Sequence, residues 1–455
     1  MEIYKSKNIE DLENKKISNL LWQYAIPSII GITVIALYNI IDSIYIGHGP
    51  NLGDHAIGGL GVVLPIMNLI SGIGLLIGAG AATRVSLYLG KKDQESAEKV
   101  VGNSFLLTII LTSITVFGIY IYNDSILISI GATEDTFPYA KEFLQYYLPG
   151  NIFLTLNIAF NSIMRASGYP KKSMYTMLIG VIANIIIAPI FIFIFNWGMK
   201  GAAIATTISM LIGVTVVMIH FFQKKHTLLF HWKRVRINTN ITWSIINIGF
   251  APFFMQIAAS LVIFFINNQL KKFGGSTAIE AYTIANRLIM VFIMILVGLT
   301  QGMQPIIGYN YGAKKMKRVK ETLIYTIKVG VFIGFLGLLF GFFLPNWVVQ
   351  PFNPSPNLAK EASIALQIMT LTLPLSGFQM VVSNFFQCIG KAILSFFLSM
   401  TRQFLVLIPS LFILPNFFNL NGIWLSIPLS DIISTILAVF FLIYQTYKLK
   451  SLYAI

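Results

Sequence analysis

Twelve long apolar runs constrain what this chain can fold into more than any other feature. A bilayer core about 30 Å thick requires roughly 20 apolar residues in each helix that crosses it. Only 11% of the 455 residues are charged, whereas soluble domains carry about a quarter. We therefore exclude an ordinary soluble enzyme and predict an all-α membrane protein with spans at 18–46, 56–87, 100–122, 139–165, 173–196, 200–223, 242–268, 278–304, 322–344, 361–386, 393–415 and 421–446.

The basic residues predict how the spans are oriented. Of the 32 Lys and Arg residues, 23 lie on one side of the predicted spans and 4 lie on the other. Because cytoplasmic loops are enriched in Lys and Arg, we expect both termini in the cytoplasm. The net charge of +15 then reflects topology, and nucleic-acid binding is not needed to explain it. The first 17 residues are polar and charged, so we interpret the apolar run after them as the first helix and not as a signal peptide.

The two halves of the chain resemble each other at an offset near 222 residues. Pro27 matches Pro252, and Gly90 matches Gly312 in the third basic segment of each half. Each half has six spans, so both halves enter the membrane in the same sense, as in a parallel repeat. We expect two six-helix lobes suited to alternating access, the alternative being a duplicated scaffold without transport. The expected organisation is 1–17 as a cytoplasmic N-terminal segment, 18–223 as the N-lobe, 224–241 as a cytoplasmic linker, 242–446 as the C-lobe and 447–455 as a cytoplasmic tail.

The sequence has no motif for a soluble energy source or for catalysis. An ATP-driven pump needs the pattern G-x-x-x-x-G-K-[ST] and a membrane zinc peptidase needs H-E-x-x-H, and neither pattern occurs. The five histidines lack the spacing of metal ligands, and the single cysteine, Cys388, excludes an internal disulfide. We expect no enzymatic activity, no metal site and no cofactor, with a gradient of H⁺ or Na⁺ as the energy source.

Four ionisable residues stand out inside the predicted spans, where a charge is costly unless it is paired or faces water. Arg402 and Asp431 reach similar depth on the last two spans, so we expect a structural ion pair, with Arg287 as a further member. A substrate role for these charges is the alternative. Asp42 has no basic residue close by, and low dielectric favours the neutral, proton-carrying form of an unpaired carboxylate. We predict that Asp42 binds the coupling cation, with Asn39 one turn away, the alternative being a hydrogen-bonded Asp at the headgroups.

Five segments, in order along the chain, carry a resemblance to a known family. They are NIIDSIYIG (39–47), RASGYPKKS (165–173), NWGMKGAAIATTIS (196–209), GMQPIIGYNYGAKKMKRV (302–319) and TRQFLVLIPSLFILP (401–415). Together they resemble the multidrug and toxic compound extrusion (MATE) exporters, and above all the MepA-like bacterial branch. The resemblance covers nearly the whole chain, and it implies two six-helix lobes that exchange organic cations for H⁺ or Na⁺.

The resemblance also implies a cation site in the N-lobe. Related members use an Asp in the first helix, an Asn and an Asp four residues apart in the fifth, and a Thr in the sixth. Asp42, Asn184 and Thr206 match this set, whereas the second acidic position is Ala188. The missing carboxylate disfavours a pre-charged Na⁺ site and favours H⁺ coupling at Asp42. The expected polar neighbours of Asp42 are therefore Asn39, from its position one turn away, and Asn184 and Thr206, from the resemblance.

The seventh predicted helix lacks the Glu that another branch of the family uses. Gln256 and Asn267 are its polar groups, and they are candidates for a C-lobe polar site. The expected partners are small organic cations and the lipid bilayer, without nucleic acid, and we expect a monomer in the bacterial inner membrane. The alternative function is a flippase for a lipid-linked precursor, from the same wider superfamily. Arg287 and Arg402 pointing between the lobes, free of Asp431, would favour that alternative.

Overall fold

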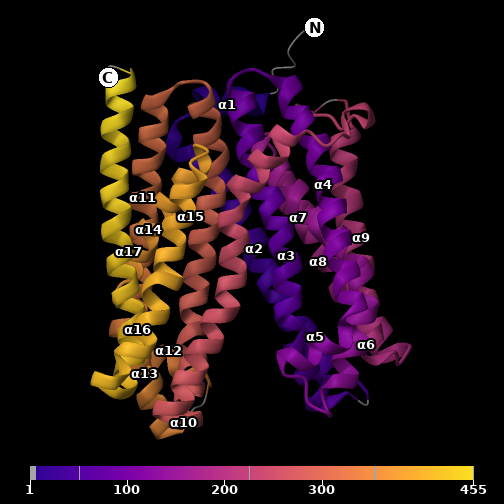
Figure 1. The fold of residues 1–455 in the computed structure, drawn as a ribbon, viewed down its shortest axis with the longest axis vertical. Helices are drawn as coiled ribbons and strands as arrows, with labels where there is room; N and C mark the ends of the chain where they lie inside the picture. The colour runs from indigo at the N-terminus through magenta and orange to yellow at the C-terminus, as the bar shows by residue number, and fades with distance from the viewer. Residues whose placement is uncertain (1–6, 51, 225, 353–354, 454–455) are drawn as a thin grey trace.

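The structure, a computed structural model, describes residues 7–50, 52–224, 226–352 and 355–453, and every regular element in these residues is helical. The helices form two bundles (Figure 1), which are the predicted N-lobe and C-lobe. The bundles lie side by side at the end that carries α1 (Lys7–Asn14), which we call the terminal end. They diverge toward the opposite, distal end, where α5 (Asn123–Ile130) and α12 (Pro345–Val349) lie.

The N-lobe contains the predicted first six spans. Its elements are α2 (Ile17–His48), α3 (Gly53–Gly90), α4 (Gln94–Ile121), α5, α6 (Phe137–Tyr147), η1 (Leu148–Gly150), α7 (Asn151–Ala166), α8 (Pro170–Pro189), η2 (Ile190–Ile194) and α9 (Gly198–Phe222). Helix α6, the short turn η1 and α7 follow one another without a gap and form the fourth span. The linker to the C-lobe contains one short element, η3 (Trp232–Arg234).

The C-lobe contains the other six spans. Its elements are α10 (Thr239–Gly312), α11 (Met316–Leu338), η4 (Leu339–Phe343), α12, η5 (Gln350–Phe352), α13 (Pro356–Thr370), α14 (Leu373–Cys388), α15 (Ala392–Met400), η6 (Thr401–Leu407), α16 (Ile408–Ile413) and α17 (Pro415–Tyr453). The long α10 is two helices that meet at Gly275, whose φ of 65° and ψ of −155° suit only glycine. Helices α13 and α14 form one span bent by 45°. The prediction of twelve spans in two lobes is confirmed.

Residues with a left-handed backbone recur at the same places in the two halves. The pairs lie 222 or 223 residues apart, and they are Gly53 with Gly275, Lys92 with Lys314, Gly168 with Gly390, and Asn196 with Asn419. A positive φ is uncommon for residues other than glycine, and a lysine in this region at matching positions indicates a shared backbone path. The internal repeat read from the sequence is therefore also a repeat of backbone conformation.

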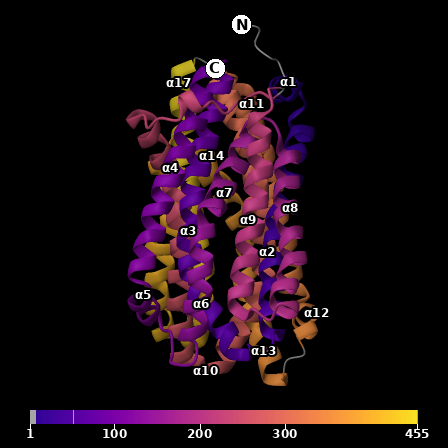
Figure 2. The ribbon, with the colours of Figure 1, turned by 90° about the vertical axis from the view of Figure 1, so that its right-hand side faces the viewer.

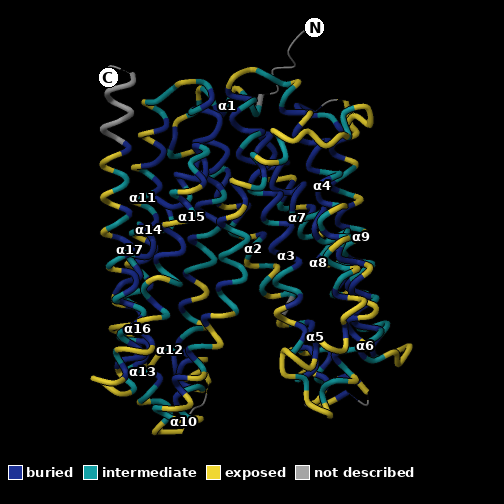
Figure 3. Tube along the Cα trace, in the orientation of Figure 1, coloured by how far each residue is buried: buried dark blue, intermediate teal, exposed yellow. Residues whose placement is uncertain are grey.

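The hydrophobic core shows how the lobes are joined. One cluster of buried residues combines both lobes and includes Leu21 and Ile77 of the N-lobe with Leu296 of the C-lobe. Two further clusters belong to one lobe each, around Phe143 in the N-lobe and around Trp424 in the C-lobe. The lobes therefore share a core toward the terminal end and have separate cores toward the distal end. Figure 2, turned by 90°, shows the helices running along the long axis of the molecule, and Figure 3 shows buried segments within both bundles.

Hydrogen bonds also join the lobes across the shared core. Gln304 Nε2 on α10 donates to the Ala79 carbonyl at 3.1 Å and to Thr83 Oγ1 at 2.9 Å on α3. Trp22 Nε1 on α2 donates to Tyr325 Oη on α11 at 3.3 Å. These bonds hold the first two helices of the N-lobe against the C-lobe.

Candidate functional site

Asp42 is a buried carboxylate of the N-lobe. It lies on α2, and only 6% of the residue is exposed. Its Oδ1 atom is buried and receives no hydrogen bond from the described residues. Because desolvation of a polar atom is costly without a partner, this oxygen is suited to bind a proton or another cation.

Three polar side chains form the neighbouring part of the site. Asn184 Nδ2 on α8 donates to Thr206 Oγ1 on α9 at 3.2 Å. Tyr38 Oη, one turn before Asp42 on α2, lies 3.4 Å from the same Thr206 oxygen. Thr206 in turn donates to the Ala202 carbonyl at 2.9 Å. Thr206 thus joins Asn184 of α8 to Tyr38 of α2, a tyrosine that was not among the residues predicted for the site.

The surroundings of Asp42 are aromatic and contain no countercharge among the described side chains. Tyr38 and the fully buried Tyr147 of α6 both lie close enough to interact electrostatically with its carboxylate. No salt bridge joins Asp42 to a basic side chain in the described residues. Asn39 lies on α2, but its side chain falls outside the described ones.

Ala188 occupies the position at which a second carboxylate was implied. It is completely buried and packs in the separate core of the N-lobe, next to Ile192. Pro189 follows directly, and η2 after it is a π-helix. π-Helical turns are frequent at functional sites, and this one begins close to Asn184. The site therefore has one carboxylate, with an apolar side chain in place of the second.

Arg402 and Asp431 form an ion pair in the C-lobe. Arg402 Nε lies 2.7 Å from Asp431 Oδ1, and the Asp431 side chain is 2% exposed. Asp431 Oδ2 accepts hydrogen bonds from Thr372 Oγ1 at 2.8 Å and Ser376 Oγ at 2.6 Å. Both oxygens of this carboxylate are therefore satisfied, and the group holds η6, α14 and α17 together.

Arg287 does not join this pair, contrary to the prediction. Its guanidinium lies 5.6 Å from the ring centre of Phe352, in η5 at the distal end, and the residue is exposed. The prediction was wrong because the depth of a residue along its helix does not determine which face of the helix carries the side chain. Arg287 is thus stabilised by an aromatic ring in place of a carboxylate.

Gln256 and Asn267 do not form one C-lobe site. They are eleven residues apart on α10, which separates them by about 16 Å along the helix axis. Gln256 Nε2 instead donates to Asn68 Oδ1 on α3 of the opposite lobe, at 3.2 Å. Asn267 is half-buried farther toward the distal end.

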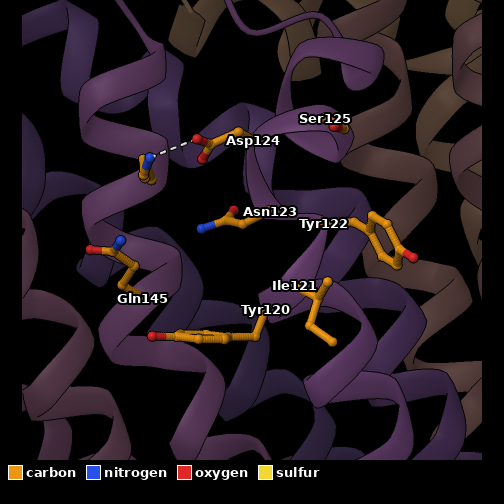
Figure 4. Close-up of a pocket in the computed structure, with 8 residues that line it drawn as sticks. Tyr120, Ile121, Tyr122, Asn123, Asp124, Ser125 and Gln145 are labelled. Atoms are coloured by element: carbon orange, nitrogen blue, oxygen red, sulfur yellow. Dashed lines mark hydrogen bonds and ion pairs between the residues drawn. The ribbon is translucent and has the colours of Figure 1, made fainter.

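A separate pocket of about 280 Å³ lies at the distal end of the N-lobe, between the end of α4 and the helices α5 and α6 (Figure 4). Tyr120, Asn123 and Gln145 are among its lining residues. Lys141 and Asp124 form an ion pair of 2.8 Å at its edge. None of the residues predicted for the site lies in this pocket. In the described part of the chain, no cluster of three His, Cys, Asp or Glu side chains has the geometry of a metal site.

Comparisons with known proteins agree with the two-lobe architecture. The chain matches the MatE family over residues 27–190 and 251–413, one segment in each lobe. It is 28% identical to the multidrug export protein MepA of Staphylococcus haemolyticus over 436 residues, which cover 96% of this chain and 95% of that protein. A solved structure described as MATE in the bent conformation has a TM-score of 0.93 at 24% identity, covering 99% of this chain and 100% of that chain. A solved structure described as the outward-facing conformation of a multidrug resistance MATE family transporter of the MOP superfamily has a TM-score of 0.91 at 24% identity. The match covers 98% of this chain and 99% of that chain.

Proposed function

This chain belongs to the MatE family of multi-span membrane transporters, and on that premise we propose that it is a secondary active multidrug exporter. It exchanges organic cations for H⁺ by alternating access, with Na⁺ as the alternative coupling ion. The similarity to MepA multidrug export proteins along nearly the full length of both chains supports this substrate class. We further propose that it works as a monomer in the bacterial inner membrane.

The orientation of the lobes supports alternating access. The positive-inside distribution of Lys and Arg assigns the terminal end to the cytoplasm. The lobes share a core at that end and separate toward the distal end. The structure is then an outward-facing state, from which a substrate leaves the cell.

The observation that carries the proposal is the unpaired Oδ1 of Asp42. A buried carboxylate without a countercharge exchanges a proton more readily than one held in an ion pair, because no basic group fixes its charge. Protonation from the outside neutralises Asp42 and lowers the affinity of the N-lobe for a cation. Release of the proton to the cytoplasm restores the negative charge that attracts the next organic cation.

The exporter proposal is tested with Asp42→Asn in proteoliposomes. We expect pH-gradient-driven efflux of a cationic dye to fall at least about tenfold, because the variant has no carboxylate to protonate. Asp124→Asn is the matched control, since Asp124 is an exposed acid at the distal end. Undiminished efflux by Asp42→Asn excludes this coupling site.

The coupling ion is tested by imposing a pH gradient and a Na⁺ gradient separately on the same vesicles. We expect the pH gradient to drive efflux, since Ala188 removes one of the two carboxylates that a Na⁺ site of this family would contain. Efflux driven by Na⁺ alone would contradict H⁺ coupling while leaving the exporter proposal intact.

The flippase alternative gains no support from the cationic side chains. A diphosphate headgroup would need unpaired positive charges between the lobes, and Arg402 is bound to Asp431 at 2.7 Å. Arg287 contacts Phe352. We therefore keep the export of organic cations as the proposed function.

A further inference from the structure

The seam between α3 and the first half of α10 consists of contacts spaced one helical turn apart. A Cβ on Gly80 would lie 2.1 Å from the Ile245 carbonyl oxygen, and one on Gly249 would lie 1.7 Å from the Leu76 carbonyl oxygen. These distances show that the two backbones touch. One turn farther toward the distal end, Gly72 packs against the ring of Phe253, with 3.1 Å from its Cβ position to the nearest ring atom.

The next turn of the seam is polar. Asn68 Oδ1 accepts a hydrogen bond from Gln256 Nε2 at 3.2 Å, and Asn68 Nδ2 donates to Ser260 Oγ at 3.1 Å. We call these three residues the amide bridge. All three are half-buried, and Gln256 Oε1 accepts no hydrogen bond from the described residues. One asparagine of the N-lobe thus bonds two successive turns of the C-lobe.

The lobes separate directly beyond the amide bridge. One turn farther on the same helix faces, Leu64 is 50% exposed and Phe264 is 61% exposed. Still farther along α3, a Cβ on Gly61 would meet no heavy atom within 4 Å. Among the described residues, the amide bridge is the hydrogen-bonded contact between α3 and α10 that lies nearest the distal end, with the exposed Leu64 and Phe264 one turn beyond it.

We propose that the amide bridge is part of the substrate site and changes partners when the lobes move. In the outward-facing state Asn68, Gln256 and Ser260 bond to one another, and their affinity for a substrate is low. When the seam opens toward the cytoplasm, Asn68 Oδ1 loses its partner across the lobes and becomes a free acceptor like Gln256 Oε1. Both oxygens then accept hydrogen bonds from the N–H groups of an organic cation.

The chemistry of the amide bridge defines the preferred ligand. Asn68 Oδ1 and Gln256 Oε1 are acceptors without a formal charge, and Phe253 supplies an aromatic face beside them. A flat aromatic cation with amidine or amine N–H groups fits these groups, because hydrogen bonds from a charged donor are the stronger kind. A cation without N–H groups forms no hydrogen bond with the amide oxygens. This inference rests on the proposed export of organic cations and adds a preference among them.

The test compares two cationic probes that differ in N–H groups. The first is the diamidine dye 4′,6-diamidino-2-phenylindole, and the second is tetraphenylphosphonium, which has no hydrogen-bond donor. Equilibrium binding to the full chain in lipid nanodiscs is measured for wild type, Asn68→Leu and Gln256→Leu. We expect Kd for the diamidine to rise about tenfold in both variants, while Kd for tetraphenylphosphonium changes less than about twofold.

Three further variants keep the test decisive. Asn68→Gln retains an amide and should recover part of the diamidine affinity, whereas Ser260→Ala removes only one hydrogen bond and should have a smaller effect. Thr215→Val is the matched control, because Thr215 is an exposed residue of α9 whose hydroxyl donates within the same helix, to the Leu211 carbonyl at 2.7 Å. Equal changes in Kd for both probes, or no change for the diamidine, would overturn the proposal. Because binding needs no ion gradient, these outcomes are independent of those that test coupled export.

Discussion

At the level of single residues, the two membrane carboxylates differ in how their oxygens are satisfied. Asp431 has an arginine on one oxygen and two hydroxyl donors on the other. Asp42 has one oxygen without a partner among the described residues. A buried ion pair is stable only when both members are present, whereas an unpaired carboxylate is free to gain and lose a proton. This difference supports the proposed structural role of Asp431 and the proposed ion coupling at Asp42.

The structural role of Asp431 predicts a loss of stability in single variants. Asp431→Asn leaves the Arg402 charge buried without its partner, which costs about 3–5 kcal/mol in comparable buried pairs. We expect a lower midpoint of thermal unfolding in detergent, measured by intrinsic fluorescence. The double variant Arg402→Leu/Asp431→Leu should recover most of the loss, because no charge then remains buried. Equal destabilisation by the single and double variants would contradict this reading.

For single residues, the sequence could predict how deep a side chain lies along its span, but not which face of the helix carries it. Arg402 and Asp431 were paired correctly because consecutive antiparallel spans place residues at equal distance from one end side by side. Arg287 was misplaced because counting residues along α10 gives no information on its helix face. Tyr38 was missed although it precedes Asp42 by four residues, the spacing that places side chains on one face. Asn68 was missed because its partners are distant in the sequence.

At the level of elements, each segment that precedes the first helix of a lobe crosses to the opposite lobe. Helix α1 precedes the N-lobe but contacts the C-lobe, where Lys315 Nζ lies 2.7 Å from Glu13 Oε1. Arg318 Nη2 donates to the carbonyls of Leu12 at 3.3 Å and Lys15 at 2.8 Å. The equivalent segment of the second half is the linker before α10, and it contacts α4 of the N-lobe. The contacts there are an ion pair of Glu98 with Arg234 and a hydrogen bond from Asn103 Nδ2 to the Arg236 carbonyl at 3.2 Å.

Because α1 contacts the C-lobe through Glu13, we predict that Glu13→Gln shifts the opening of the terminal end modestly, and by the same amount at every physiological pH. The pKa of Glu13 is lowered from 4.5, mainly because Lys315 donates a hydrogen bond to it. Its stabilising contribution is therefore complete above this value and is lost only as the pH falls through the lowered pKa. Glu13 stays ionised between pH 5 and 8 by this reasoning, so it cannot sense a physiological pH gradient.

The expected effect of Glu13→Gln is a few-fold shift toward opening of the terminal end, because a half-exposed ion pair contributes about 1 kcal/mol or less. Distances between spin labels on the two lobes, measured from pH 5 to pH 8, report this shift. The shift should be the same at both pH values, and Glu10→Gln, an exposed acid on the same helix, is the control. A pH-dependent shift would show that Glu13 takes part in coupling.

The close glycine contacts between α3 and α10 predict that an added methyl group disturbs the packing of these two helices. Gly249→Ala places a methyl group on the Leu76 carbonyl oxygen, and overpacking of this kind costs about 1–3 kcal/mol. We expect the outward-facing population and the rate of dye efflux to fall about tenfold. Gly61→Ala, in open space on α3, is the matched control and should transport normally. Normal efflux by Gly249→Ala would mean that the seam does not close during transport.

The prediction of elements from the sequence succeeded for the spans and failed for their irregularities. Apolar length determines a span, so twelve runs gave twelve spans. The π-helices η2 and η6 lie next to Pro189 and Pro409, and the prolines were visible in the sequence. Whether a proline produces a kink or a π-turn depends on neighbouring helices that supply or withhold partners for the freed carbonyl groups. The sequence alone does not show which neighbouring groups are available to bond these carbonyls.

For the whole molecule, the repeat extends to the backbone but not to the polar sites. The positive-φ pairs show one backbone path in both lobes. In the described part of the chain, however, the buried carboxylate with an unpartnered oxygen belongs to the N-lobe, and the buried Arg402–Asp431 pair belongs to the C-lobe. The repeat was predictable because prolines within helices and glycines at helix ends recur at matching positions in both halves. The difference between the polar contacts of the two lobes was not predictable, because it depends on which side chains meet in space.

In the proposed alternating-access cycle, the two lobes rock against each other and must break their contacts at the terminal end in every transport cycle. Cysteines at Trp22 and Tyr325, whose side chains meet across the lobes at 3.3 Å, are joined by a short reducible thiol crosslinker in a Cys388→Ala background. We expect efflux to stop on crosslinking and to return on reduction, because the shared core cannot open. Crosslinking Asn346→Cys to Ser363→Cys, which meet within the C-lobe at 3.1 Å, should leave efflux unchanged. Transport that survives the first crosslink would require a path within one lobe and would exclude rocking of the two lobes.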